Sequence, residues 1–114
     1  MTIKLIKDKI SKDELKNVAL EIFGEMVKVV VDIQREIMAV GGELHADGEA
    51  LLLKDGSNQD NLWGINIYPD KSVEDWIIFT ALINIRPRLG NKSMEIQDKN
   101  IKEKIKKIVN KLVE

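Results

Sequence analysis

The stretch from Ser11 to Val40, SKDELKNVALEIFGEMVKVVVDIQREIMAV, decides the fold class. Ser11 followed by Glu14 is a capping box, in which each side chain bonds the other residue's backbone amide at the start of a helix. Apolar residues then recur at helical spacing, at Leu15, Val18, Ala19, Ile22, Met26, Val29, Val30, Ile33, Ile37 and Val40. The periodicity predicts one long helix over residues 11–40, with a kink or break at Gly24.

The same stretch contains a run that also fits a strand. Val27, Val29, Val31 and Ile33 alternate and are β-branched, which favours β structure. Val30 breaks the polar face that a half-exposed strand needs, and the helical pattern continues on both sides of the run. The helix is therefore the prediction, and a strand over residues 27–33 stays open.

The middle of the chain is predicted to be β. Residues 43–46 and 50–54 flank Asp47-Gly48, a dipeptide that suits a two-residue hairpin turn. Longer strands are expected over residues 62–68 (LWGINIY) and 76–86 (WIIFTALINIR), each followed by a proline.

The ends of the chain complete the predicted fold. Residues 2–6 (TIKLI) favour a short strand, residues 88–97 are expected to be a loop, and residues 98–113 have the pattern of an amphipathic helix. The predicted class is α+β: a long N-terminal helix, an antiparallel meander of about four strands and a C-terminal amphipathic helix. We expect a single domain over residues 1–114.

Composition excludes several classes of protein. The 114 residues contain 18 Lys and Arg against 19 Asp and Glu, so the chain lacks the basic excess typical of nucleic-acid-binding domains. The absence of cysteine excludes disulfides and thiolate metal sites. No apolar run approaches the roughly 18 residues of a membrane span, so we expect a cytoplasmic protein with no membrane partner. Without a Gly-rich phosphate loop or a metal-binding motif, we expect no cofactor and no metal.

His45 and Asp47 are the candidate catalytic residues. They alternate with Glu43 and Glu49, so on a continuous strand all four side chains would share one face. An imidazole beside a carboxylate is a usable acid–base pair. A turn at Asp47-Gly48 would break this alternation, and His45 would then be an ordinary edge-strand residue.

The segment INIRPRLGN, residues 83–91, is a candidate anion site. Two of the three arginines lie two positions apart in a chain that has 15 lysines, and arginine suits planar pairing with carboxylate or phosphate. The candidate ligands of an anionic small molecule or a nucleic-acid phosphate are Asn84, Arg86, Arg88 and Asn91. The alternative is pairing with carboxylates of the same protein or its dimer mate. If the anion is external, Arg86→Lys should change stability by less than about 0.5 kcal/mol.

The second face of the predicted strand 76–86 is too apolar for exposure to water. It carries Trp76, Ile78 and Leu82, so we expect a helix or a second copy of the chain to cover it. A homodimer is the prediction.

Three strings in this order, GGELHADGEALLLKDGS, NLWGINIYPD and INIRPRLGN, resemble a family of short prokaryotic proteins of about this length with no assigned function. The resemblance runs from about Lys12 to the C-terminus. It implies a complete protein and supplies no activity, cofactor or site residue.

Three functions follow as hypotheses. The first is a binding or regulatory module, homodimeric, with an anion-recognising patch at Asn84, Arg86 and Arg88. The second is a small hydrolase or nuclease in which His45 and Asp47 act on a phosphate that the arginines hold. The third is a partner-binding subunit of a stress-response module.

Overall fold

Residues 11–41 form a short helix followed by a hairpin of strands. In the computed structural model, which describes residues 3–114, α1 (Lys12–Ile22) begins at Ser11, whose hydroxyl accepts a hydrogen bond from the Glu14 amide at 3.0 Å. The helix ends at Phe23, and Gly24 follows with a φ of 89°, a left-handed conformation that glycine adopts without strain. The cap at Ser11 is confirmed, while the Glu14 carboxylate of the predicted box contacts Lys4. The prediction of a helix reaching residue 40 is wrong.

Strands β2 (Val27–Asp32) and β3 (Ile37–Gly41) form an antiparallel hairpin, so the alternative left open for residues 27–33 is the correct one. Val29 and Val31 enter one hydrophobic core, and Val30 enters a second core on the opposite face. A strand buried on both faces has no polar side. Val30 is thus a sign of two-sided burial and not an argument for helix.

The sheet has five strands instead of about four. The others are β1 (Ile3–Ile6), β4 (Leu62–Ile67) and β5 (Ile77–Ile78), and the order is β1-β3-β2-β4-β5 with every pair antiparallel. The short strand expected over residues 2–6 is confirmed over residues 3–6. Thr2 lies outside the described residues.

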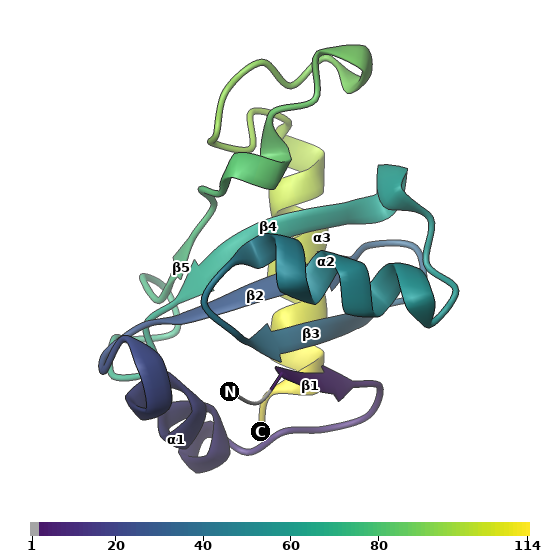
Figure 1. Cartoon of the computed structure of the whole chain (residues 1–114). Helices are drawn as coiled ribbons and strands as arrows, with labels where there is room; N and C mark the ends of the chain where they lie inside the picture. The colour runs from purple at the N-terminus through teal and green to yellow at the C-terminus, as the bar shows by residue number, and fades with distance from the viewer. Residues whose placement is uncertain (1–2) are drawn as a thin grey trace.

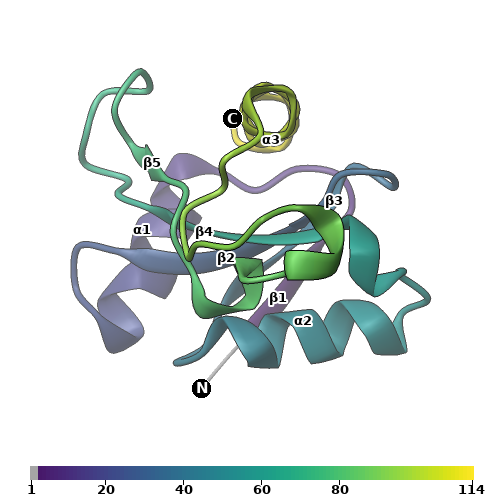
Figure 2. The ribbon, with the colours of Figure 1, turned by 90° about the horizontal axis from the view of Figure 1, so that it is seen from above.

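Helices cover both faces of the sheet, as Figures 1 and 2 show. Helix α2 (His45–Lys54) packs on one face over a small core. Helices α1 and α3 (Lys99–Leu112) contribute to the larger core on the other face. The predicted C-terminal helix is confirmed, with its apolar side buried and Asp98 as its cap. The α+β class is confirmed, whereas the long N-terminal helix is not.

The predicted hairpin around Asp47-Gly48 is wrong, because these residues lie in α2. A Cβ atom on Gly48 would lie 3.2 Å from Val30 Cγ2 and 3.4 Å from Ala39 Cβ. The glycine lets the helix pack close to the sheet and makes no turn. His45 and Asp47 are therefore helical residues and do not alternate along a strand.

The predicted strand 76–86 is correct only at β5. Residues 79–97, which we call the 79–97 segment, run beyond the sheet through two short 3-10 helices, η2 (Leu82–Asn84) and η3 (Pro87–Leu89). Isolated bridges join Thr80 to Glu95 and Arg86 to Asn91. Figure 1 shows this segment standing above the edge of β4.

Side chains of the 79–97 segment, in place of a strand, close the outer edge of β4. The Asn84 amide nitrogen donates to the Gly64 carbonyl oxygen at 2.9 Å, and its oxygen accepts from the Gly64 N–H at 2.8 Å. The Arg86 guanidinium donates to the Leu62 carbonyl oxygen. Backbone groups that β5 is too short to reach are thus satisfied by side chains.

Candidate functional site

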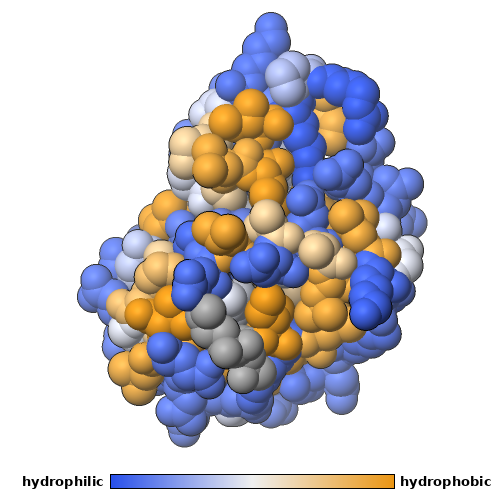
Figure 3. Space-filling model, viewed as in Figure 1, coloured by the Kyte–Doolittle hydropathy of each residue, from blue (hydrophilic) through white to orange (hydrophobic). Residues whose placement is uncertain are grey.

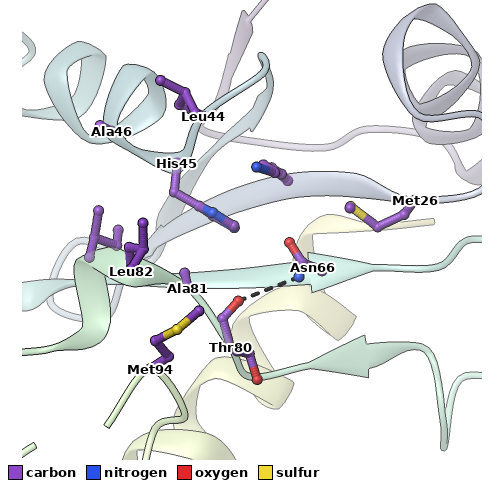
Figure 4. Close-up of a pocket in the computed structure, with 11 residues that line it drawn as sticks. Met26, Leu44, His45, Ala46, Asn66, Thr80, Ala81, Leu82 and Met94 are labelled. Atoms are coloured by element: carbon purple, nitrogen blue, oxygen red, sulfur yellow. Dashed lines mark hydrogen bonds between the residues drawn. The ribbon is translucent and has the colours of Figure 1, made fainter. Parts of the chain in front are cut away.

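A cavity of about 450 Å³ opens between the start of α2, strand β4 and the 79–97 segment. We call it the α2–β4 cavity, and Figure 4 shows the residues that line it. Most of the wall is apolar and comes from Met26, Leu44, Ala46, Ala81, Leu82, Ile83 and Met94. The polar residues in the wall are Lys28, His45, Asn66 and Thr80. A cavity of this size with few polar groups has the properties of a small-molecule site.

His45 lies at the first turn of α2, and its ring is buried against β4. Its Nε2 atom lies 2.8 Å from the Ile65 carbonyl oxygen, which can only accept, so Nε2 carries the proton. Burial lowers the pKa of the imidazole, against the opposing effects of the Ile65 hydrogen bond and of the nearby Asn66 amide. The ring is therefore neutral at pH 7, and Nδ1 holds a lone pair that can accept a hydrogen bond.

Gly64 lets three elements meet at this wall. A Cβ atom there would lie 2.6 Å from Ala81 Cβ, 3.0 Å from Ile83 Cγ1 and 3.1 Å from His45 Cδ2. No side chain fits between β4 and these neighbours. The absence of a side chain at Gly64 is what allows α2 and the 79–97 segment to approach the same strand.

Asn66 places an unpaired oxygen beside the cavity. Its amide nitrogen donates to the Thr80 carbonyl oxygen at 3.4 Å. Its Oδ1 atom is buried and has no hydrogen-bond partner among residues 3–114. Figure 4 shows this oxygen on the side of Asn66 toward His45. A buried acceptor without a donor is rare in folded proteins and costs free energy.

The lowered pKa of His45 predicts a pH dependence of stability. The unfolded chain protonates its single histidine at about pH 6.5, whereas the folded chain does so only at lower pH. Between the folded and the unfolded pKa the unfolded state binds more protons, so the free energy of unfolding should fall as pH decreases from about 7 to about 5. Urea unfolding at both values measures this loss, and His45→Gln should reduce it. An imidazole that titrates at its ordinary pKa in the folded protein would contradict the prediction.

The structure does not bring His45 and Asp47 together. His45 is buried and faces β4, whereas Asp47 is exposed and its Cβ lies beside the backbone of Gly42. Residues two apart on a helix point to different sides. The predicted pairing required a strand, and the helix separates the two side chains, although a catalytic role for either stays a prediction.

Asn84 and Asn91 are buried and bonded to the backbone of the chain. Besides its two bonds to Gly64, the Asn84 side-chain amide donates to the Met94 carbonyl oxygen at 3.1 Å. The Asn91 side-chain nitrogen donates to the carbonyl oxygens of Asn84, Ser93 and Glu95. The Asn91 side-chain oxygen accepts from the backbone N–H of Gln97. Both side chains hold the 79–97 segment in place.

Arg86 and Arg88 pair inside the chain. Arg86 contacts Glu49 at 2.7 Å, and the two side chains are only 11% and 14% exposed. Arg88 is exposed and forms a two-pronged contact with Asp60, which lowers the pKa of that carboxyl. A second cavity of about 400 Å³ adjoins both arginines, but Glu49 also lines it. The internal pairing left open by the sequence is present, and binding of an external anion stays a prediction.

His45 and Arg86 line two neighbouring cavities, and Ile83 lies in the wall of both.

The apolar face predicted for residues 76–86 does not stay together in the structure. Trp76 enters the larger core, while Ile78 and Leu82 are exposed.

Sequence reasoning missed Asn66. The available signal is that the face of LWGINI opposite Trp63, Ile65 and Ile67 carries a glycine and an asparagine, a small and a polar residue in an otherwise apolar strand.

The fold and the site define a small α+β protein with a mainly apolar cavity at the edge of a five-stranded sheet. A family model matches residues 4–112, and the chain belongs to that family, described as Protein of unknown function (DUF5674). The resemblance drawn from the sequence motifs, to a family without an assigned function, is confirmed. Neither a curated protein nor a solved structure matches the chain.

Two further observations concern the described residues. None of the helices between residues 3 and 114 combines the length and apolar character needed to cross a membrane. Within the same range, no three His, Cys, Asp or Glu side chains gather as metal ligands would.

Proposed function

We propose that this protein is a binding module that holds a small, mainly apolar molecule in the α2–β4 cavity. The observation that carries the proposal is the cavity itself. It has about 450 Å³ of space, largely apolar walls and a buried acceptor, Asn66 Oδ1, that has no partner among residues 3–114. Ligand sites typically have this combination of apolar walls and a few oriented polar groups.

Apolar side chains continue from the cavity onto the surface. Leu44, Leu82 and Met94 line the cavity and are 57%, 71% and 41% exposed. Figure 3 shows apolar surface gathered over η2 and the neighbouring start of α2. Exposed apolar residues that cluster beside a cavity are typical of a binding surface. Single exposed apolar residues, in contrast, are common on any soluble protein.

The earlier hypotheses fit the geometry less well. An anion at Arg86 would have to compete with Glu49 for the guanidinium. A hydrolase or nuclease built on His45 would need a carboxylate at the ring, and Asp47 lies elsewhere. The hydrolase or nuclease, the anion patch and a subunit of a stress-response module stay untested predictions.

Homodimerisation and a cytoplasmic location are part of the proposal. Ile78, Leu82 and Ile85 are each more than two-fifths exposed, so a second copy that covered them would remove apolar surface from water. Light scattering in dilute solution measures the mass, and a monomer at all concentrations would contradict the dimer without affecting the cavity.

A matched pair of alanine substitutions tests the cavity. Ala46 and Ala50 are both exposed and lie one turn apart on α2, but only Ala46 lines the cavity. With 3-methylindole as the probe, methyl NMR signals of Met26 and Met94 should shift and saturate. Ala46→Trp should weaken this binding at least about tenfold, or about 1.4 kcal/mol, because the indole ring obstructs the cavity. Ala50→Trp should leave it unchanged.

Met38 is an internal reference for this experiment, because it lies in the larger core and away from the cavity. Its signal should not move with the probe. If 3-methylindole shifts neither cavity methionine, or if both tryptophan variants bind as the wild type does, the proposed function is wrong.

A further inference from the structure

We infer that the α2–β4 cavity selects an uncharged ligand through an O–H or N–H group that donates a hydrogen bond to Asn66 Oδ1. The ligand class is a compact, mainly apolar molecule with one such donor, for example an aryl alcohol or an N–H heteroaromatic. The inference rests on the proposed function and adds the chemical group that is recognised.

The orientation of the Asn66 amide is set by its neighbour. Its nitrogen faces the Thr80 carbonyl oxygen at 3.4 Å, as the dashed line in Figure 4 shows. Rotating the amide by half a turn would place two acceptors against each other, so the oxygen must be the atom left on the other side. That oxygen is buried and has no partner among residues 3–114.

Two side chains with donors in the cavity wall have other contacts. The Nε2–H group of His45 donates to the Ile65 carbonyl oxygen at 2.8 Å. The Lys28 ammonium lies over the Phe23 ring, 5.1 Å from its centroid. Neither group bonds Asn66 Oδ1. The Thr80 hydroxyl does not bond it either, so none of the donors among residues 3–114 pairs with this oxygen, and a ligand or water would supply one.

The unpaired acceptor of the wall disfavours an anion beside Asn66, although the Lys28 ammonium, which also lines the cavity, would favour one. Asn66 Oδ1 is an acceptor, and a carboxylate has only acceptors to offer it. A neutral molecule with a donor satisfies Asn66 and leaves its apolar body against Met26, Ala81 and Met94. Discrimination of this kind follows from a site built around a hydrogen bond.

Two isomers test the inference without a change in size. 3-Methylindole keeps its N–H, whereas 1-methylindole carries the methyl group on nitrogen and has no donor. With the full-length wild type, 3-methylindole should bind about fivefold more tightly, the factor expected for one hydrogen bond. In Asn66→Leu the two isomers should bind equally. In the wild-type complex, the indole N–H should show a nuclear Overhauser effect to the Asn66 amide protons.

The outcomes separate this inference from the proposed function. If both isomers shift the Met26 and Met94 signals with equal affinity, the donor recognition is wrong and the cavity still binds. If neither isomer shifts them, both proposals fail. If 1-methylindole-3-carboxylate binds more tightly than 3-methylindole, the inference is overturned, because an anion near Lys28 then determines selection. The Overhauser measurement uses the wild type alone, so it decides the question even if Asn66→Leu does not fold.

Discussion

Arg86→Lys is expected to lower the free energy of unfolding by about 2 to 3 kcal/mol. The guanidinium donates at once to the carbonyl oxygens of Gln59 and Leu62 and to Glu49. A single ammonium group cannot reproduce this planar fork, so carbonyl oxygens would lose their donor. Urea unfolding followed by tryptophan fluorescence measures the loss, since the Trp63 ring centroid lies 5.4 Å from the guanidinium carbon.

Arg88→Lys is the matched control, because Arg88 is 70% exposed and bonds only the side chain of Asp60 among residues 3–114. Its urea midpoint should be nearly that of the wild type. Removing both members of the buried pair, as Arg86→Met with Glu49→Leu, should restore part of the stability that Arg86→Met loses. A loss below about 0.5 kcal/mol in Arg86→Lys would instead show that the guanidinium is free to hold an external anion.

Asn84→Asp is expected to lower the free energy of unfolding by about 3 to 5 kcal/mol, which is more than for Arg86→Lys. The wild-type amide nitrogen donates to the carbonyl oxygens of Gly64 and Met94, and the side chain is fully buried. A carboxylate has the same shape and no donor, so it would put a negative charge against two acceptors. Thermal or urea unfolding near pH 7 measures the effect.

Asn58→Asp is the control for the same chemical change at an exposed site. The Asn58 side chain accepts from the Asp60 amide at 3.0 Å, and a carboxylate accepts equally well. We expect Asn58→Asp to lower the free energy of unfolding by less than about 1 kcal/mol. If both substitutions lowered it equally, the view that Asn84 replaces a strand partner of β4 would be contradicted.

The elements that the sequence predicts well depend on local signals. The cap at Ser11 requires only neighbouring residues, and it forms as expected. The strand over residues 62–68 and the helix over residues 98–113 each have one clear period and match β4 and α3 within a residue. One apolar face of each element, with Trp63, Ile65 and Ile67 in β4, enters the larger core.

The predictions that fail involve residues whose partners are distant in sequence. Helical spacing and strand alternation coexist in VKVVVD, and the choice depends on whether both faces of the segment are covered. Gly48 resembles a turn residue until the distance from α2 to Val30 shows that it is a packing residue. The candidate site shows the same division. The sequence indicates His45 as a candidate, whereas the unpaired oxygen of Asn66 becomes evident only beside Thr80.

By itself the sequence determined the α+β class, the helix cap, the strand β4 and the amphipathic helix α3, because these depend on propensity and period within one segment. Only the tertiary structure decided that Asn84 and Arg86 close a sheet edge and that a cavity opens beside His45. Backbone N–H and C=O groups along the edge of β4 lack a strand partner only once the sheet has formed. No local sequence pattern therefore predicts which side chains will bond them.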